Sequence, residues 1–176
     1  MTATVFPPLT IADTIAAGPG PGNTDPRVLA AFANAGVADH MQADVLRGMI
    51  ESKHMLREIW GTQNRYTFGV AGTGWSALDT LFSAVKPGDT VVAFANGTFS
   101  GIDALTLRIK AATPQEHAQQ PQNPDAKSVT VIDVPHGSSV EASTIQAALA
   151  EHRPKWAFMA HWETGSGRVN DLRAFS

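Results

Sequence analysis

Apolar positions recur at helical spacing in some segments and form short unbroken runs in others, which predicts a mixture of helices and strands. Between residues 43 and 60 the apolar side chains recur at helical spacing, and Gly61 suits the end of a helix. Later apolar runs, VVAFA at 91–95 and WAFMA at 156–160, lack strict alternation. Strands that are buried on both faces have this pattern. Strands and helices that follow one another in turn predict a parallel sheet covered by helices.

The remaining elements are expected between turn signals rich in glycine and proline. A short helix is expected to begin at Asp25-Pro26, because proline suits the first helical turn. Four strands are expected, at 66–71, 90–95, 128–134 and 156–160. Helices are expected between them, at 75–85, 99–110 and 142–151. The fold class predicted from this order is α/β.

The ends of the chain and one internal segment differ from the rest. Residues 1–25 are expected to form an extended arm, because they end in the glycine- and proline-rich AGPGPGNTDP. Residues 26–176 then form one domain, with a mobile surface loop at about 111–127 that is rich in proline and glutamine. The final segment, 171–176, resembles the first turn of a helix with no remaining length, so we expect that domain to be incomplete.

Composition narrows the class of protein. The chain has 176 residues, 43% of them hydrophobic and 16% charged, with a net charge of −3, which is typical of a soluble globular protein. No basic stripe is visible, so nucleic acid is not an expected partner. The lack of cysteine excludes disulfides and thiol catalysis. No signal peptide or membrane span is evident, so we expect a cytoplasmic protein without a membrane partner.

Three segments that follow expected strands could carry chemistry. Ala71-Gly72-Thr73-Gly74-Trp75 precedes a helix, whose free N–H groups could bind a phosphate. A turn of this kind between a strand and a helix often has only a structural role. In 96–101, Phe99 could stack on a flat ring or belong to the core, and the sequon Asn96-Gly97-Thr98 is a chance match. In 161–167, Thr164 could donate to a small ligand, whereas His161 and Glu163 lack a third ligand for a metal.

The ordered set of these segments resembles class V aminotransferases of pyridoxal 5′-phosphate (PLP) fold type I. The family members most similar in pattern are the alanine–glyoxylate and serine–pyruvate aminotransferases. The segments that carry the resemblance are AGPGPGN at 17–23, AGTGWSALD at 71–79, KPGDTVVAFANGTFSG at 86–101 and HWETGSGRVNDL at 161–172. The resemblance implies that the chain is the N-terminal part of the large domain, with a mostly parallel sheet and helices on both faces.

The family also implies roles for individual residues. Thr73, Gly74 and Trp75 would bind the PLP phosphate, Phe99 would stack on its pyridine ring, and Thr164 would lie near its phenolic oxygen. Gly22 and Asn23 would line the substrate pocket. The family often has histidine or another small polar group at the place of Trp75, and tryptophan at that of Phe99. Its Schiff-base lysine, and the aspartate that pairs with the pyridine nitrogen, belong to a C-terminal half that these 176 residues do not include. We therefore expect no catalytic residue and no metal ligand in this chain.

The expected function is transfer of an amino group between a small amino acid and a 2-oxo acid such as glyoxylate or pyruvate, with the chain inactive by itself. The expected partners are those substrates, PLP, and a second copy or a complementary C-terminal chain. Two alternatives stay open. One is a non-catalytic phosphate-binding, nucleotide-binding or interaction module, since fold alone does not decide function. The other is a PLP lyase or an aminophosphonate transaminase on the same scaffold.

Overall fold

The computed structural model describes residues 15–16, 20, 22–33, 36, 39–122 and 126–175. The chain divides into two compact units, Met1–Val37 and Ala38–Ser176. Most of the arm predicted at 1–25 lies outside the described residues. Within the described part, no helix is both long and apolar enough to cross a lipid bilayer.

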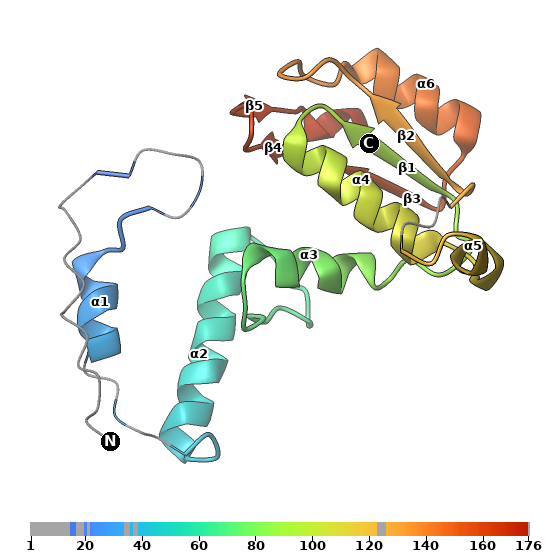
Figure 1. Cartoon of the computed structure of the whole chain (residues 1–176). Helices are drawn as coiled ribbons and strands as arrows, with labels where there is room; N and C mark the ends of the chain where they lie inside the picture. The colour runs from blue at the N-terminus through green and yellow to red at the C-terminus, as the bar shows by residue number, and fades with distance from the viewer. Residues whose placement is uncertain are drawn as a thin grey trace, which may run out of the picture. The chain divides into compact units, whose positions relative to one another are not determined.

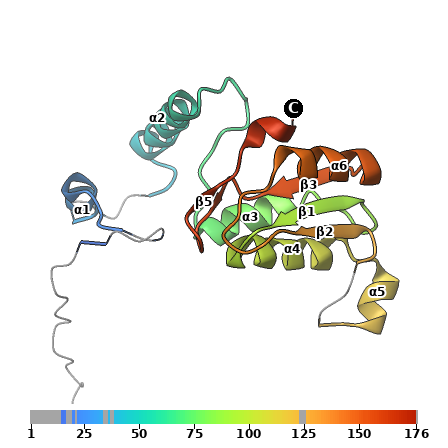
Figure 2. The same ribbon diagram turned by 90° about the horizontal axis from the view of Figure 1, so that it is seen from above.

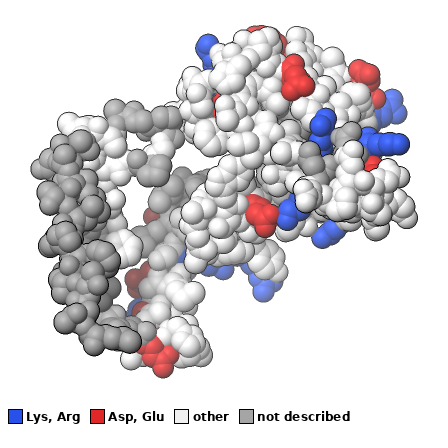
Figure 3. Space-filling view, viewed as in Figure 1, with Lys and Arg blue, Asp and Glu red and all other residues white. Residues whose placement is uncertain are grey.

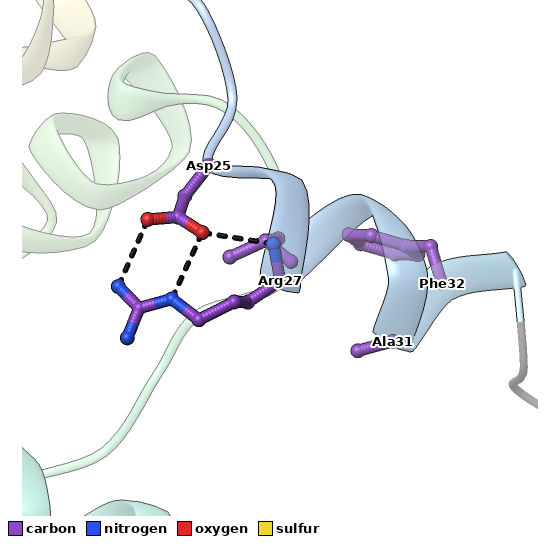
Figure 4. Close-up of a pocket in the computed structure, with 5 residues that line it drawn as sticks. Asp25, Arg27, Ala31 and Phe32 are labelled. Atoms are coloured by element: carbon purple, nitrogen blue, oxygen red, sulfur yellow. Dashed lines mark hydrogen bonds and ion pairs between the residues drawn. The ribbon is translucent and has the colours of Figure 1, made fainter.

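The first unit contains the short helix α1 (Pro26–Ala33), which begins where the sequence predicts. The Asp25 carboxylate accepts a hydrogen bond from the backbone N–H of Arg27 at 2.8 Å and also binds the Arg27 guanidinium (Figure 4). Asp25 thus caps the helix, and Pro26 occupies its first turn. Val28, Ala31 and Phe32 line an apolar hollow of about 550 Å³ beside this pair.

The second unit begins with α2 (Ala43–Trp60), and its predicted bounds are confirmed. Gly61 ends the helix in the left-handed conformation, with φ of 59°. None of the α2 residues is buried. The large apolar side chains exposed on this helix are Leu46, Met49, Ile50, Met55, Ile59 and Trp60. The helical period therefore predicts the element correctly, but the residues that the structure describes leave its apolar face exposed.

A three-stranded parallel sheet forms the centre of the second unit (Figure 1). Its strands are β1 (Val91–Ala95), β2 (Val129–Asp133) and β3 (Trp156–Met159), in the spatial order β2-β1-β3. The central strand pairs Val91 with Val129 on one side and with Trp156 on the other. All five β1 residues are buried, which confirms the expectation drawn from its unbroken apolar run.

Helices cover both faces of this sheet, as Figure 2 shows for α4 and α6. On one face, α3 (Gly74–Phe82) and α4 (Thr98–Ala111) contribute Phe82 and Leu107 to a core that includes Val91 and Ala93. On the other face, α6 (Ala142–His152) packs Ile145 and Ala148 against Val92 and Phe94. The alternate side chains of β1 thus enter two separate cores, and the predicted α/β architecture is confirmed.

A small hairpin and a 3₁₀ helix follow the last strand of the sheet. β4 (Trp162–Glu163) and β5 (Arg168–Val169) form an antiparallel hairpin. The 3₁₀ helix η1 (Leu172–Phe175) comes next, at the place where a helical turn is expected. Its Phe175 ring meets that of Phe94 edge to face, with 5.9 Å between centroids.

Two expectations about local structure are wrong. Residues 66–71 are not a strand, and the sheet has three of the four predicted strands. An extended segment becomes a strand only when a neighbour supplies the hydrogen bonds of a ladder, and no described strand pairs with this one. The predicted loop at 111–127 contains the helix α5 (Pro114–Gln119). Thr113 and Glu116 close its first turn reciprocally, and the Glu116 carboxylate also accepts the Lys127 N–H at 3.0 Å.

Charged side chains of both signs are interspersed on the face seen in Figure 3. The net charge of −3 is therefore not concentrated in one acidic area of this face. Such a surface creates no strong field of a single sign towards a charged partner.

Candidate functional site

Polar side chains gather where the strands of the sheet end. Asn96 follows β1 and is 0% exposed, and Glu163, in the hairpin after β3, is also 0% exposed. Ser100 and Asn170 are buried beside them, at 2% and 1%. Because parallel strands bring their carboxyl ends to one edge, segments far apart in sequence meet there, and this edge is where open α/β sheets bind ligands.

The Glu163 carboxylate is bound by three backbone N–H groups. Its Oε2 accepts from Ser100 at 2.8 Å, and its Oε1 accepts from Gly165 at 2.9 Å and from Phe99 at 3.3 Å. Phe99 and Ser100 lie in the first turn of α4, whose N-cap residue, Gly97, has no side chain that could accept these bonds. A carboxylate from a distant hairpin therefore caps this helix.

Two glycines make room for this carboxylate. A Cβ at Gly97 would lie 2.4 Å from Cγ of Glu163, so any larger residue there would displace the glutamate. A Cβ at Gly165 would lie 3.1 Å from Oε1 of Glu163 and 3.5 Å from the Phe99 ring. Glu163, Phe99 and the turn at Thr164-Gly165 are thus packed closely together.

The buried amide side chains of Asn96 and Asn170 hold the same edge of the sheet together. Asn96 donates through Nδ2 to the Ser138 carbonyl at 2.8 Å and to Oδ1 of Asn170 at 3.2 Å. Asn170 donates to the Ala160 carbonyl at 2.7 Å and accepts the Val140 N–H at 2.9 Å. These bonds tie together the segments that follow all three strands of the sheet. They also bury the Asn96 side chain, which keeps the sequon closed to a glycan.

Two carboxylates at this edge have opposite shifts in pKa. Burial raises the pKa of Glu163, but hydrogen bonds from Ser100, Gly165 and Phe99 outweigh it, so the net shift is downward and the group is charged near neutral pH. Burial raises the pKa of Asp103 to about 6, and the negative charge of Glu163 adds to that effect. One Asp103 carboxylate oxygen is buried without a hydrogen-bond partner in the part of the chain that the structure describes.

The first turn of α3 is arranged differently. Thr73 is its N-cap residue, yet the Thr73 side chain makes no capping hydrogen bond, and Thr73, Gly74 and Trp75 are all exposed. Gly72 has φ of 148°, and a Cβ on it would lie 2.3 Å from Oγ of Ser76, so this position requires glycine. The helix therefore presents open N–H groups to solvent above a tight glycine turn.

The structure brings together only some of the residues predicted for the site. Phe99, 42% exposed, lies against the turn that contains the half-buried Thr164. Among the described residues, no hydrogen bond or ring contact joins Thr73, Gly74 or Trp75 to either of them. Gly22 and Asn23 belong to the first unit, where Asn23 accepts the Ala16 N–H at 2.7 Å.

The five lysines lie elsewhere. Lys86, Lys127 and Lys155 precede β1, β2 and β3 at the amino edge of the sheet, and Lys155 pairs with Asp89 at 2.9 Å. Lys110 is near the end of α4 and pairs with Asp79, and Lys53 is on α2. None of these five lysines belongs to the segments at the carboxyl edge of the sheet that carry Phe99 and Thr164.

The motifs of the sequence do not disclose several residues of this edge. The sequence indicates Glu163 only as a possible metal ligand, whereas in the structure its carboxylate binds backbone N–H groups. A charged residue directly after an apolar strand is a signal that could have drawn attention to it. Ser100 and Asn170 lie within the quoted segments 86–101 and 161–172 but carry no expected role there, and Asp103 lies outside these segments. Only their contacts in the folded chain identify them.

Comparison with solved structures defines the class of protein to which this architecture corresponds. Alanine–glyoxylate aminotransferase from Nostoc sp. matches with a TM-score of 0.78 and 31% identity, over 96% of this chain and 41% of that one. Ureidoglycine–glyoxylate aminotransferase from Bacillus subtilis matches with a TM-score of 0.74 and 27% identity, over 90% and 37%. The fold is that of a part of the PLP-dependent transferases of fold type I.

Comparison with curated sequences specifies the relatives. Alanine–glyoxylate aminotransferase from Mus musculus is 32% identical over 171 residues, which are 96% of this chain and 37% of that protein. (S)-Ureidoglycine–glyoxylate transaminase from Bacillus subtilis (strain 168) is 28% identical over 157 residues, 89% and 34% respectively. No family model matches the chain. The resemblance to class V aminotransferases is confirmed, and the chain spans little more than a third of the length of these relatives.

Proposed function

We propose that this chain supplies the phosphate-binding and ring-stacking part of a PLP site in an aminotransferase that moves an amino group between a small amino acid and a 2-oxo acid such as glyoxylate or pyruvate. The observation that carries the proposal is the match to alanine–glyoxylate aminotransferases over 96% of the chain, at 31–32% identity. Glyoxylate is part of the names of these relatives, and the rest of the proposed activity follows from their class.

The residues of the chain fit the cofactor chemically. The open first turn of α3 offers N–H groups to the phosphate at Gly74 and Trp75, and the Thr73 hydroxyl adds a donor. The exposed Phe99 ring offers a face for stacking, and Thr164 beside it offers a hydroxyl to the phenolic oxygen. PLP, when bound, supplies an electron sink for bonds at the α-carbon of the amino acid. Gly22 and Asn23 are proposed to line the substrate side.

The chain by itself is proposed to be inactive in transamination. The reaction needs an amine that carries the cofactor and moves the α-proton, and general acid–base catalysis of that kind is typically worth about 10² to 10⁴-fold. The lysines beside the sheet lie at its amino edge or pair with aspartates, away from Phe99. Robust turnover of alanine and glyoxylate by the purified chain, free of other aminotransferases, would refute this part of the proposal.

The phosphate assignment is tested by replacing Thr73. In Thr73→Glu a carboxylate enters the open turn of α3, where charge repulsion should weaken binding of PLP at least tenfold. Thr80→Glu is the matched control, since Thr80 is exposed on the same helix and the net charge is the same. Binding is measured by equilibrium dialysis. Equal affinity of Thr73→Glu and wild type would remove the phosphate from this turn.

The exposed apolar face of α2 supports self-association or binding of a complementary chain. Ile59 is 75% exposed, Met49 64% and Trp60 62%, whereas apolar burial contributes about 25 cal/mol per Å² to stability. Sedimentation of the chain over a range of micromolar concentrations should show mass that rises with concentration. A single species of 18.6 kDa at every concentration would contradict this expectation.

A further inference from the structure

We propose that Glu163 is a positioning residue, whose buried carboxylate sets the stacking ring of Phe99 and the hydroxyl of Thr164 at a fixed spacing through backbone hydrogen bonds. The inference rests on the proposed function, because it concerns the same site. It goes further because Glu163, which would not itself touch the cofactor, would determine how Phe99 and Thr164 are placed around the ring.

The carboxylate joins two segments that are 63 to 64 residues apart in sequence. Its hydrogen bonds to Phe99 and Ser100 hold the start of α4, and its bond to Gly165 holds the turn that carries Thr164. Oε1 accepts from Phe99 and Gly165 at once, so one atom sets the distance between the two ligand-facing segments. Phe99 is in α4 and Thr164 is in the turn of the β4–β5 hairpin. The two residues are therefore not in paired strands, and no ladder of strand hydrogen bonds sets the distance between them.

The residues around Glu163 leave a space that fits its carboxylate. Glu163 is fully buried, and glycine at 97 leaves the space that its Cγ and Cδ occupy. Ser100 completes the arrangement, because its hydroxyl accepts the N–H groups of Asn96 and Gly97 at 3.0 Å. The hydrogen bonds keep the carboxylate ionised, as its lowered pKa indicates. A charged acceptor forms stronger bonds than a neutral one, so it holds the two segments more firmly.

The occupied turn of α4 also bears on where a phosphate can bind. Two helices of the second unit, α3 and α4, begin near ligand-facing segments. The Glu163 carboxylate fills the N-terminus of α4, so an anion would meet a negative charge there. Glu163 would therefore affect how the ring is held, while the phosphate cradle at α3 stays independent of it. This separation distinguishes a positioning residue from one that merely stabilises the fold.

Three probes separate these contributions in the 176-residue chain. Inorganic phosphate engages only an anion cradle, pyridoxine offers only the ring, and pyridoxine 5′-phosphate offers both without an aldehyde that reacts with surface lysines. Glu163→Gln keeps the shape of the side chain but turns an NH₂ donor towards the backbone N–H groups. This variant should bind pyridoxine and pyridoxine 5′-phosphate about tenfold more weakly. Its affinity for inorganic phosphate should equal that of wild type.

A second variant displaces the Glu163 carboxylate without altering the net charge. Gly97→Ala forces Glu163 away from its position and should give the same pattern of probe affinities. Gly101→Ala is the matched control, since it adds the same methyl group in α4 where no neighbouring atom lies within 4 Å. Amide hydrogen exchange should accelerate at Phe99 and Gly165 together in the first variant and stay unchanged in the control. If Glu163→Gln does not fold, Gly97→Ala alone carries the test.

The outcomes separate this inference from the proposed function. Equal weakening of phosphate and ring probes in Glu163→Gln or Gly97→Ala would overturn it, because the residue would then act only through general stability. Unchanged ring-probe affinity in these variants would overturn it as well. If Thr73→Glu leaves phosphate binding intact, the phosphate assignment at α3 fails, and the inference about Glu163 is then decided by pyridoxine alone. If the wild-type chain binds none of the probes, the proposed function and the inference about Glu163 both fail.

Discussion

The first turns of α3 and α4 both follow a glycine-containing segment, yet their N–H groups meet different surroundings. At α4, the Glu163 carboxylate binds the N–H groups of Phe99 and Ser100, and this carboxylate is buried. At α3, the Thr73 side chain makes no capping bond and the residues around it are exposed. A capped turn can only hold its own residues in place, whereas an open one can still bind an anion.

Removing the carboxylate that caps α4 should change the stability of the protein more than any other substitution in this comparison. Glu163→Ala leaves the buried N–H of Ser100 and the part-buried N–H groups of Phe99 and Gly165 without this acceptor, which should lower the free energy of unfolding by about 2–4 kcal/mol. The measurement is urea denaturation of wild type and variant. Formate should partly restore the stability of the variant, since its carboxylate fits the vacated seat, whereas chloride at equal ionic strength should not. Wild-type stability in Glu163→Ala would show that the capping bonds are unimportant.

A smaller effect is expected from the second carboxylate near the capped turn. The raised pKa of Asp103, about 6, means that the unfolded chain loses this proton at lower pH than the folded chain does. The folded state is therefore penalised progressively as pH rises from about 4 to 6, and fully above that. Asp103→Asn should remove the penalty and gain on the order of 1 kcal/mol at pH 7, after allowance for solvent screening.

Denaturation of Asp103→Asn at several pH values checks both the sign and the window of this effect. The gain over wild type should be absent at pH 3.5 and complete near pH 7. Asp133→Asn is the control, because Asp133 is exposed at the end of β2. A gain that does not depend on pH would mean that the Asp103 charge is not its origin.

The smallest change expected is at the open turn. Thr73→Asp supplies α3 with a charged cap and should stabilise the chain by about 0.3–1 kcal/mol at low salt. The gain should shrink in 1 M salt, since the interaction is exposed and screened. Thermal unfolding of Thr73→Asp and of Thr80→Asp, the control on the same helix, measures it. Destabilisation in Thr73→Asp would indicate that the turn is already satisfied in solution.

Local signals in the sequence predict much of this fold, because they depend on residues close in the chain. The helical period of 43–60 and Gly61 define α2 to the residue, and the apolar run of β1 indicates burial on both faces. The helix α5 could also have been found, since Thr113 and Glu116 at the spacing of a capping box stand within the proline-rich segment. Composition alone suggested a loop there.

Features that depend on distant contacts could not be predicted in this way. Residues 66–71 have the composition of a strand, but a strand needs a neighbour, and the pattern does not reveal whether one is present. For the same reason the motifs indicated Phe99 and Thr164 separately and gave no sign of the carboxylate between them. The sequence separation of 63 residues between Glu163 and Ser100 lies beyond any local period.

The buried amide of Asn96 has a chemical consequence for the lifetime of the protein. An asparagine followed by glycine is the pair most prone to deamidation, in which the glycine nitrogen attacks the side-chain carbonyl and ammonia leaves. Here the Asn96 side chain is held by Ser138 and Asn170, and the Gly97 N–H is bound to the Ser100 hydroxyl. These hydrogen bonds hold both reacting groups and oppose the ring closure. Deamidation at Asn96 should therefore be faster in molecules in which these hydrogen bonds have opened, and its rate reports on that opening.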